Sequence, residues 1–301
     1  MPYWPRGLVV VAAAWLALGA PAAATIQEVR GIVIYALASD ARGAPLVDLT
    51  PADVVVKEDG RDREVLSVTP ATLPLQIAVL VDDNGTGVFR YGLTMLAERL
   101  QERAEISIGV IANQVQTIVA PTTDVRAWLT GISRIGVRPA TSEGGQLLEG
   151  ILEAARSFRR REARRPVIIA LTIGGDEQSP RLSTDVLDEL WKSHAALHVV
   201  YVETPTARPS SAIKKPSDLL DSNFNLSKVL GDGPKQSGGR RRDVLSQGLV
   251  PTDVQEIAAD LLRQSAIAYA RPAGSPPRRL EVSLRRRGGV VIAPTRAPAG
   301  D

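Results

Sequence analysis

Apolar runs and amphipathic stretches alternate through the middle of the chain. The run from Ile77 to Val81 and the segment PVIIALT at residues 166–172 are almost entirely apolar, which is typical of strands buried on both faces of a parallel sheet. Between such runs, apolar residues recur at intervals of three and four, which predicts helices. The predicted strands are residues 76–82, 105–113, 115–119, 166–172 and 197–203, and the predicted helices are residues 88–103, 124–132, 145–161, 184–195 and 253–266.

Strands that alternate with helices favour an α/β fold with a doubly wound, mostly parallel, Rossmann-like sheet. We place this domain at residues 73–265. Within it, residues 204–239 are rich in Pro, Ser, Gly and Lys and show little periodicity, so we interpret them as a flexible insertion.

The two ends of the mature chain have strand character. Residues 25–72 and 266–301 contain segments in which β-branched and polar residues alternate, and Glu58-Asp59-Gly60 predicts a tight hairpin turn. An isolated hairpin is only marginally stable in water. We therefore expect the two ends to pack together as a small accessory β unit.

Residues 1–24 have the features of a secretory signal peptide. Arg6 precedes an apolar run from Leu8 to Leu18, and small residues follow at Ala22 to Ala24. The run is short for a membrane span. We expect cleavage and export to the periplasm or the medium, with no stable membrane span afterwards; an uncleaved anchor is the alternative.

Composition narrows the possible chemistry. The absence of cysteine excludes disulfides, thiol catalysis and thiolate metal sites. The net charge is only +3, and the arginine runs at residues 159–165, 240–242 and 285–287 are interpreted as solvated faces. Export and the lack of aromatic residues among these arginines argue against a nucleic-acid partner.

The loop after the strand at 76–82 carries candidate binding residues. Asp82, Asn84 and Thr86 alternate along it, so three oxygen donors could converge at the carboxyl edge of the sheet, where open α/β sheets bind ligands. Oxygen donors suit Mg²⁺, Ca²⁺ or Mn²⁺. The alternative is an Asp-Asn-Gly turn that caps the next helix. Asp83 is expected to face solvent or to cap that helix.

The order of several motifs resembles that of von Willebrand factor A domains, and in particular the exported bacterial VWFA-related proteins common in Acidobacteria. These motifs are VDLTPADVVVKEDG, Asp82-x-Asn84-x-Thr86, the GG segment before the long helix, PVIIALT with its glycine turn, and DLLRQSAIAYARP followed by RRLEVSLRRRGGVVI. The resemblance covers nearly the whole mature chain.

The resemblance implies a metal-ion-dependent adhesion site, in which a divalent cation takes an acidic residue from a protein partner. Asp82 matches the first aspartate of that site, Asn84 and Thr86 stand where serines are usual, and Thr141 matches the threonine of the second loop. Ile173 replaces the last aspartate, and Asp176 is the nearest carboxylate that could substitute for it. We therefore expect a degenerate site that binds Mg²⁺, Mn²⁺ or Ca²⁺ weakly or not at all.

These observations favour a non-enzymatic protein-binding module, used for adhesion or as a scaffold. One alternative is a phosphatase of the haloacid-dehalogenase type with Asp82 as nucleophile, although Asn84 replaces the general acid. Another is a purely structural envelope scaffold that docks through its arginines. The only histidines, His194 and His198, span a predicted helix end and strand start, so they do not form a helical zinc pair.

Overall fold

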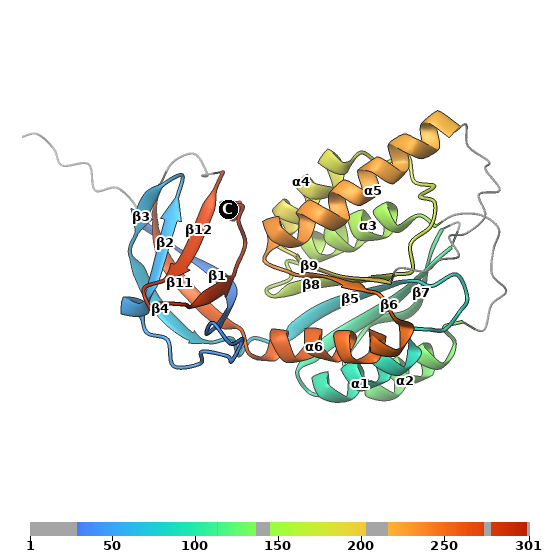
Figure 1. The fold of residues 1–301 in the computed structure, drawn as a ribbon, viewed down its shortest axis with the longest axis horizontal. Coiled ribbons are helices and arrows are strands. Elements are labelled where there is room, and N and C mark those ends of the chain that lie inside the picture. Colours follow the sequence, from blue (N-terminus) through green and yellow to red (C-terminus); the bar gives the residue numbers. More distant parts are fainter. Residues whose placement is uncertain (1–28, 113, 137–144, 203–215, 274–277, 300–301) are drawn as a thin grey trace, which may run out of the picture.

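The computed structural model describes residues 29–112, 114–136, 145–202, 216–273 and 278–299. The predicted signal peptide and Thr141 lie outside these ranges. The described chain forms an α/β core and a smaller unit of β-strands, which we call the β unit (Figure 1).

The core is built on a six-stranded sheet with the order β10-β9-β8-β5-β6-β7. All neighbours are parallel except β6 and β7. The chain moves outward from β5 through β6 to β7 and resumes on the other side of β5, so β5 and β8 meet at a topological switch point. This architecture confirms the predicted α/β fold with a mostly parallel sheet. The strands are β5 (Leu75–Asp82), β6 (Ala104–Ile111), β7 (Val115–Thr122), β8 (Pro166–Thr172), β9 (Ala196–Val202) and β10 (Arg241–Val244).

Three helices cover each face of this sheet (Figure 1). Along β5, Ile77 and Val79 pack toward α1, α2 and α6, whereas Ala78 and Leu80 pack toward α3, α4 and α5. Burial on both faces explains why the strand is a continuous apolar run. The helices are α1 (Arg90–Leu100), α2 (Val125–Ser133), α3 (Leu147–Arg160), α4 (Ser183–Ser193), α5 (Pro216–Ser237) and α6 (Val250–Leu262), with a short 3₁₀ helix at Gln247–Leu249.

Helix α5 corrects the interpretation of residues 204–239 as a flexible insertion. Residues 203–215 lie outside the described ranges, but Pro216–Ser237 form a helix of 22 residues. Leu226, Val229 and Leu230 are buried against the sheet at helical spacing. Gly233 lets the helix approach closely, because a Cβ there would lie 2.8 Å from Leu197 Cδ2. The glycines and the proline that indicated a loop are thus accommodated in a packed helix.

Removing a buried side chain from α5 is expected to destabilise the core. Leu230 is 2% exposed, so Leu230→Ala should lower the free energy of unfolding by about 2 kcal/mol through lost burial and a residual cavity. Leu220, on the same helix, is 70% exposed, and Leu220→Ala is the matched control with little effect. Urea denaturation checks both, and equal stability of the two variants would contradict the packed position of α5.

The β unit combines strands from both ends of the described chain. A four-stranded antiparallel sheet has the order β13-β1-β11-β4, and a three-stranded one has the order β12-β2-β3. Ile34, Val56 and Tyr269 belong to the apolar core between them. The strands are β1 (Val29–Ser39), β2 (Val54–Glu58), β3 (Arg61–Arg63), β4 (Val65–Pro70), β11 (Ser265–Pro272), β12 (Leu280–Leu284) and β13 (Val290–Ile292), and a 3₁₀ turn covers Pro51–Asp53.

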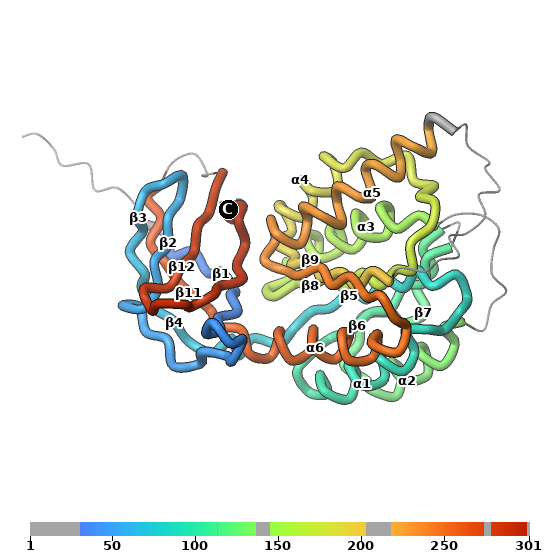
Figure 2. The backbone as a smooth tube through the Cα atoms, in the orientation of Figure 1, coloured from blue at the N-terminus to red at the C-terminus, as the bar shows by residue number. Residues whose placement is uncertain are grey.

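The predicted hairpin turn joins β2 to β3. Asp59 and Gly60 have φ angles of 47° and 78°, the left-handed conformation that a two-residue hairpin turn of this type needs. The chain passes between the β unit and the core twice, from β4 to β5 and from α6 to β11 (Figure 2). Among the helices that the structure describes, none is long and apolar enough to cross a membrane.

Candidate functional site at the carboxyl edge of the sheet

The candidate site lies at the switch point between β5 and β8. Asp82 ends β5 and Thr172 ends β8, and the two residues are paired in the sheet register. The Thr172 hydroxyl donates a hydrogen bond of 2.8 Å to Asp82 Oδ2, and both residues are buried. The first predicted site residue is therefore held at the carboxyl edge, where open α/β sheets bind ligands.

Asp83 holds the loop that follows Asp82. Its carboxylate accepts backbone N–H hydrogen bonds from Gly85 at 3.0 Å and from Gly87 at 2.7 Å, and the residue is only 1% exposed. Asp83 therefore does not face solvent; it stabilises the turn before α1. Four N–H and O–H groups of residues 85–87 bond to Asp83, which gives the loop a defined shape.

Asn84 and Thr86 lie on the outer part of this loop. Asn84 has a φ angle of 50°, a conformation that asparagine tolerates better than most residues. Thr86 is exposed, and its hydroxyl donates to the Asp83 carbonyl at 2.9 Å. The Asp-Asn-Gly alternative is thus correct for the turn, but the turn does not cap α1, whose N-cap is Phe89 with no side-chain hydrogen bond. The loop presents the side chains of Asn84 and Thr86 at the edge of the sheet.

Glu177 is a buried carboxylate near Asp82 that the sequence pattern did not single out as a site residue. It is 1% exposed, and its Oε2 accepts the backbone N–H groups of Leu147 and Leu148 at the start of α3, at 3.0 and 3.3 Å. Its Oε1 accepts the Ser179 N–H at 2.7 Å. Burial raises the pKa of Glu177 to about 8, opposed by these hydrogen bonds and assisted by the negative charge of Asp82.

Asp176 is drawn toward helix α5. Its Oδ1 accepts a hydrogen bond of 3.0 Å from Asn223 Nδ2, and Asn223 Oδ1 accepts the Glu177 N–H at 2.8 Å. Asn223 therefore fixes the turn after β8. Asn223 lies in the segment that was interpreted as flexible, so no sequence signal indicated it as a site residue. For Glu177 a signal was present in the sequence, because it is an acidic residue that follows a glycine turn at the end of a strand.

Three of the predicted metal ligands, Asp82, Thr86 and Asp176, are engaged in hydrogen bonds within the protein. No three His, Cys, Asp or Glu side chains within the described ranges form a group that could hold a metal ion. Thr86 and Asp176 already hydrogen-bond to Asp83 and Asn223. Mg²⁺ gives up its water reluctantly where few carboxylates replace it. The assignment of Asp82, Asn84, Thr86, Thr141 and Asp176 as metal ligands remains a prediction.

The two histidines lie on different elements. His194 follows α4 in a left-handed conformation, and His198 lies within β9. Burial lowers the pKa of His198 to about 4, because the charged imidazolium would be desolvated there. At neutral pH His198 is an uncharged core residue.

Comparison with known proteins gives structural matches only. No family model matches the chain, and no curated protein matches it. A von Willebrand factor type A protein from Catenulispora acidiphila matches with a TM-score of 0.43 and 8% identity, over 91% of this chain and 74% of that one.

Two further matches are proteins with longer chains. Proximal thread matrix protein 1 from the mussel byssus, with a zinc-occupied MIDAS motif, matches with a TM-score of 0.46 and 13% identity over 68% of this chain. The pilus adhesin SpaC from Lactobacillus rhamnosus GG matches with a TM-score of 0.45 and 10% identity over 83% of this chain. The chain spans 50% and 46% of their lengths, and at these TM-scores and identities no residue role is transferred from them.

Proposed function

We propose that this chain is an exported, non-enzymatic protein-binding module of the von Willebrand A type, as its sequence motifs suggest, and that its docking surface is the carboxyl edge around Asp82. The observation that carries the proposal is the loop at residues 83–87. Asp83 holds it in a defined shape at the switch point, and it presents Asn84 and Thr86. A preformed surface loses less conformational entropy when a partner binds.

The proposal assigns no catalytic role to Asp82. Asp82 is 5% exposed, and its carboxylate accepts a hydrogen bond from the Thr172 hydroxyl. The residue two positions later is Asn84, whose amide cannot act as a general acid. These features support binding over phosphoryl transfer.

Partner binding in this proposal does not depend on a tightly held ion. Asp82, Asp83 and Glu177 are buried carboxylates at the described part of the site. The Asp83 carboxylate is committed to the loop and the Glu177 carboxylate to the start of α3, each by two backbone hydrogen bonds. If Mg²⁺, Mn²⁺ or Ca²⁺ bound, Asp82, Asn84 and Thr86 would be the ligands offered by the loop, and the ion would supply a positive charge for an acidic residue of the partner.

A blocking substitution on the loop tests the docking surface. Thr86 is exposed, so Thr86→Trp should leave the fold intact and cover the edge with a large side chain. The chain is immobilised, exposed to an envelope extract of its source organism, cross-linked, and compared with the wild type by quantitative mass spectrometry. We expect Thr86→Trp to reduce capture of the specific partner at least tenfold, and we expect wild-type capture to persist in EDTA.

The matched control changes the basic end of α3. Arg160 is exposed and lies away from the loop, at the other end of the helix, so Arg160→Glu should retain capture. If Arg160→Glu lost capture of the partner and Thr86→Trp retained it, docking would instead be assigned to the arginine run, and the scaffold alternative would be supported. Loss of wild-type capture in EDTA would contradict ion-independent binding.

A further inference from the structure

A cavity of about 290 Å³ lies where the β unit meets the core. Its lining includes strand β1, the end of α4, the residues that begin β8 and β9, and the C-terminal segment from Pro294 to Ala299. Because β8 and β9 begin here, the cavity is at the amino edge of the sheet, opposite the Asp82 loop. It is therefore a separate site from the proposed docking surface.

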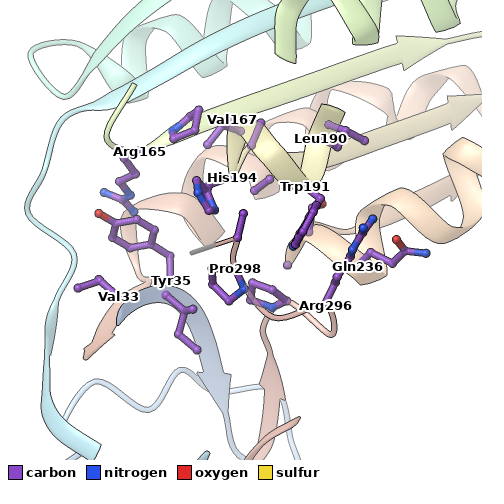
Figure 3. A pocket seen from close by; sticks show the side chains of 18 of the residues that line it. Val33, Tyr35, Arg165, Val167, Leu190, Trp191, His194, Gln236, Arg296 and Pro298 are labelled. Carbon is purple, nitrogen blue, oxygen red and sulfur yellow. The ribbon is translucent and has the colours of Figure 1, made fainter. Parts of the chain in front are cut away.

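The two sides of the cavity differ in chemistry (Figure 3). Leu190 and Trp191 of α4 lie on one side, and Arg165 and Tyr35 lie on the other. The Arg165 guanidinium stacks over the Tyr35 ring, 4.9 Å from its centroid. One side thus offers an apolar and aromatic surface, and the other offers a cation.

The charged side chains that line the cavity are all positive. Among the described residues, its charged residues are Arg164, Arg165 and Arg296, and none of the described aspartates or glutamates lines the cavity. Arg296 is already paired with Asp188 at 2.9 Å and covers the Trp191 ring. Arg164 and Arg165 form no ion pair with a carboxylate of the described residues.

Arg165 is a buried cation that forms no ion pair with any carboxylate in the part of the chain that the structure describes. It is 3% exposed, and its guanidinium donates to the carbonyls of Ala71, Leu73 and Leu261 and to the side chain of Gln264. These acceptors are all neutral. Its Nε has no hydrogen-bond partner within the described residues, and burial lowers the pKa of the guanidinium. A buried charge is costly unless it is paired, so an anion beside it would be stabilising.

We propose that this cavity binds a small organic carboxylate with a compact apolar body. The carboxylate lies on the side of Arg164 and Arg165, and the apolar body packs against Leu190 and Trp191. Hydrogen bonding to a charged acceptor supplies the affinity for the head group, and burial of the apolar body supplies the remainder. The size of the cavity, at the lower end of the range for ligand pockets, restricts the ligand to a small molecule.

Calorimetric titration of the full chain tests the proposal. The probes are benzoate, 3-phenylpropionate and octanoate, and each is compared with its uncharged amide. We expect at least one carboxylate to bind with 1:1 stoichiometry and its amide to bind at least tenfold more weakly, because the amide does not neutralise Arg165. Absence of binding by all three carboxylates, or equal binding of acid and amide, would overturn the proposal.

Three variants locate the bound probe and leave Arg165, whose removal could impair folding, in place. Val33 lines the cavity and is 52% exposed, so Val33→Trp should fill it and abolish binding. Val47 is 67% exposed and does not line the cavity, so Val47→Trp should bind as the wild type does. Arg164→Gln should weaken binding of the carboxylate but not of the amide. Unchanged binding by Val33→Trp would show that the probe binds elsewhere.

Discussion

Replacing Glu58 with glutamine is expected to lower the free energy of unfolding of the β unit by about 3 to 5 kcal/mol. Glu58 is fully buried at the end of β2, and its carboxylate accepts hydrogen bonds from Tyr269 at 2.7 Å, from Arg271 at 2.7 Å and from Arg63 at 2.8 Å. Arg271 is itself 6% exposed. Loss of the negative charge would leave the buried cation of Arg271 uncompensated, and this costs more free energy than the intact pair contributes.

Asp62→Asn is the matched control for this prediction. Asp62 lies on the neighbouring strand β3, and its side chain is 78% exposed and 3.4 Å from Lys57 Nζ. Exposed pairs of this kind contribute at most about 1 kcal/mol, so the control should be nearly neutral. Urea denaturation measures both variants. If Glu58→Gln lowered the free energy of unfolding no more than Asp62→Asn, the buried network would not hold the two sheets of the β unit together.

The second large effect is a pH dependence that comes from Glu177. Its pKa is raised from 4.5 in the unfolded chain to about 8 in the folded chain, mainly by burial. Below pH 4.5 the carboxyl is protonated in both states, and its contribution to stability is fully present. Between pH 4.5 and 8 only the unfolded state releases the proton, so stability falls as the pH rises, by up to about 4 to 5 kcal/mol.

Chemical denaturation at pH 5 and at pH 8 checks this dependence. We expect the wild type to lose stability between these values and Glu177→Gln to lose much less, because glutamine does not titrate. Glu153 is an exposed residue of α3, and Glu153→Gln should keep the wild-type dependence. His198, whose pKa is lowered to about 4, acts in the opposite direction below pH 6.5 and is common to all three proteins. Identical pH profiles for wild type and Glu177→Gln would contradict the assignment.

Strands and helices with strong periodicity were predictable from the sequence. The run PVIIALT corresponds residue for residue to β8. A strand that is buried on both faces is a continuous apolar run, so its ends are easy to recognise in the sequence. The amphipathic segment at 145–161 became α3, whose buried leucines and isoleucine belong to the apolar cluster formed with the sheet, α4 and α5. Asp82 was also predictable, since it is the charged residue that ends the apolar run of β5.

Other elements were not predictable because their stability comes from contacts. Helix α5 contains two glycines and a proline near its end, which disfavour a helix in isolation, and it is held by burial of Val229 and Leu230 and by the close approach at Gly233. The same contacts bring Asn223 to the turn after β8. The sequence pattern around the turn after β8 contains no information about Asn223, which comes from a distant part of the chain.

The sequence by itself determined the α/β class, the strands of the central sheet and the place of Asp82 at its carboxyl edge. Hydrophobic periodicity decides these features, because it specifies which face of each element is buried. Only the tertiary structure decided that Asp83 closes the loop, that Glu177 lies near Asp82, and that Arg165 lines a cavity with no carboxylate among its described lining residues. These relations join segments far apart in the chain, and the free energy of a buried charge depends on what surrounds it in space.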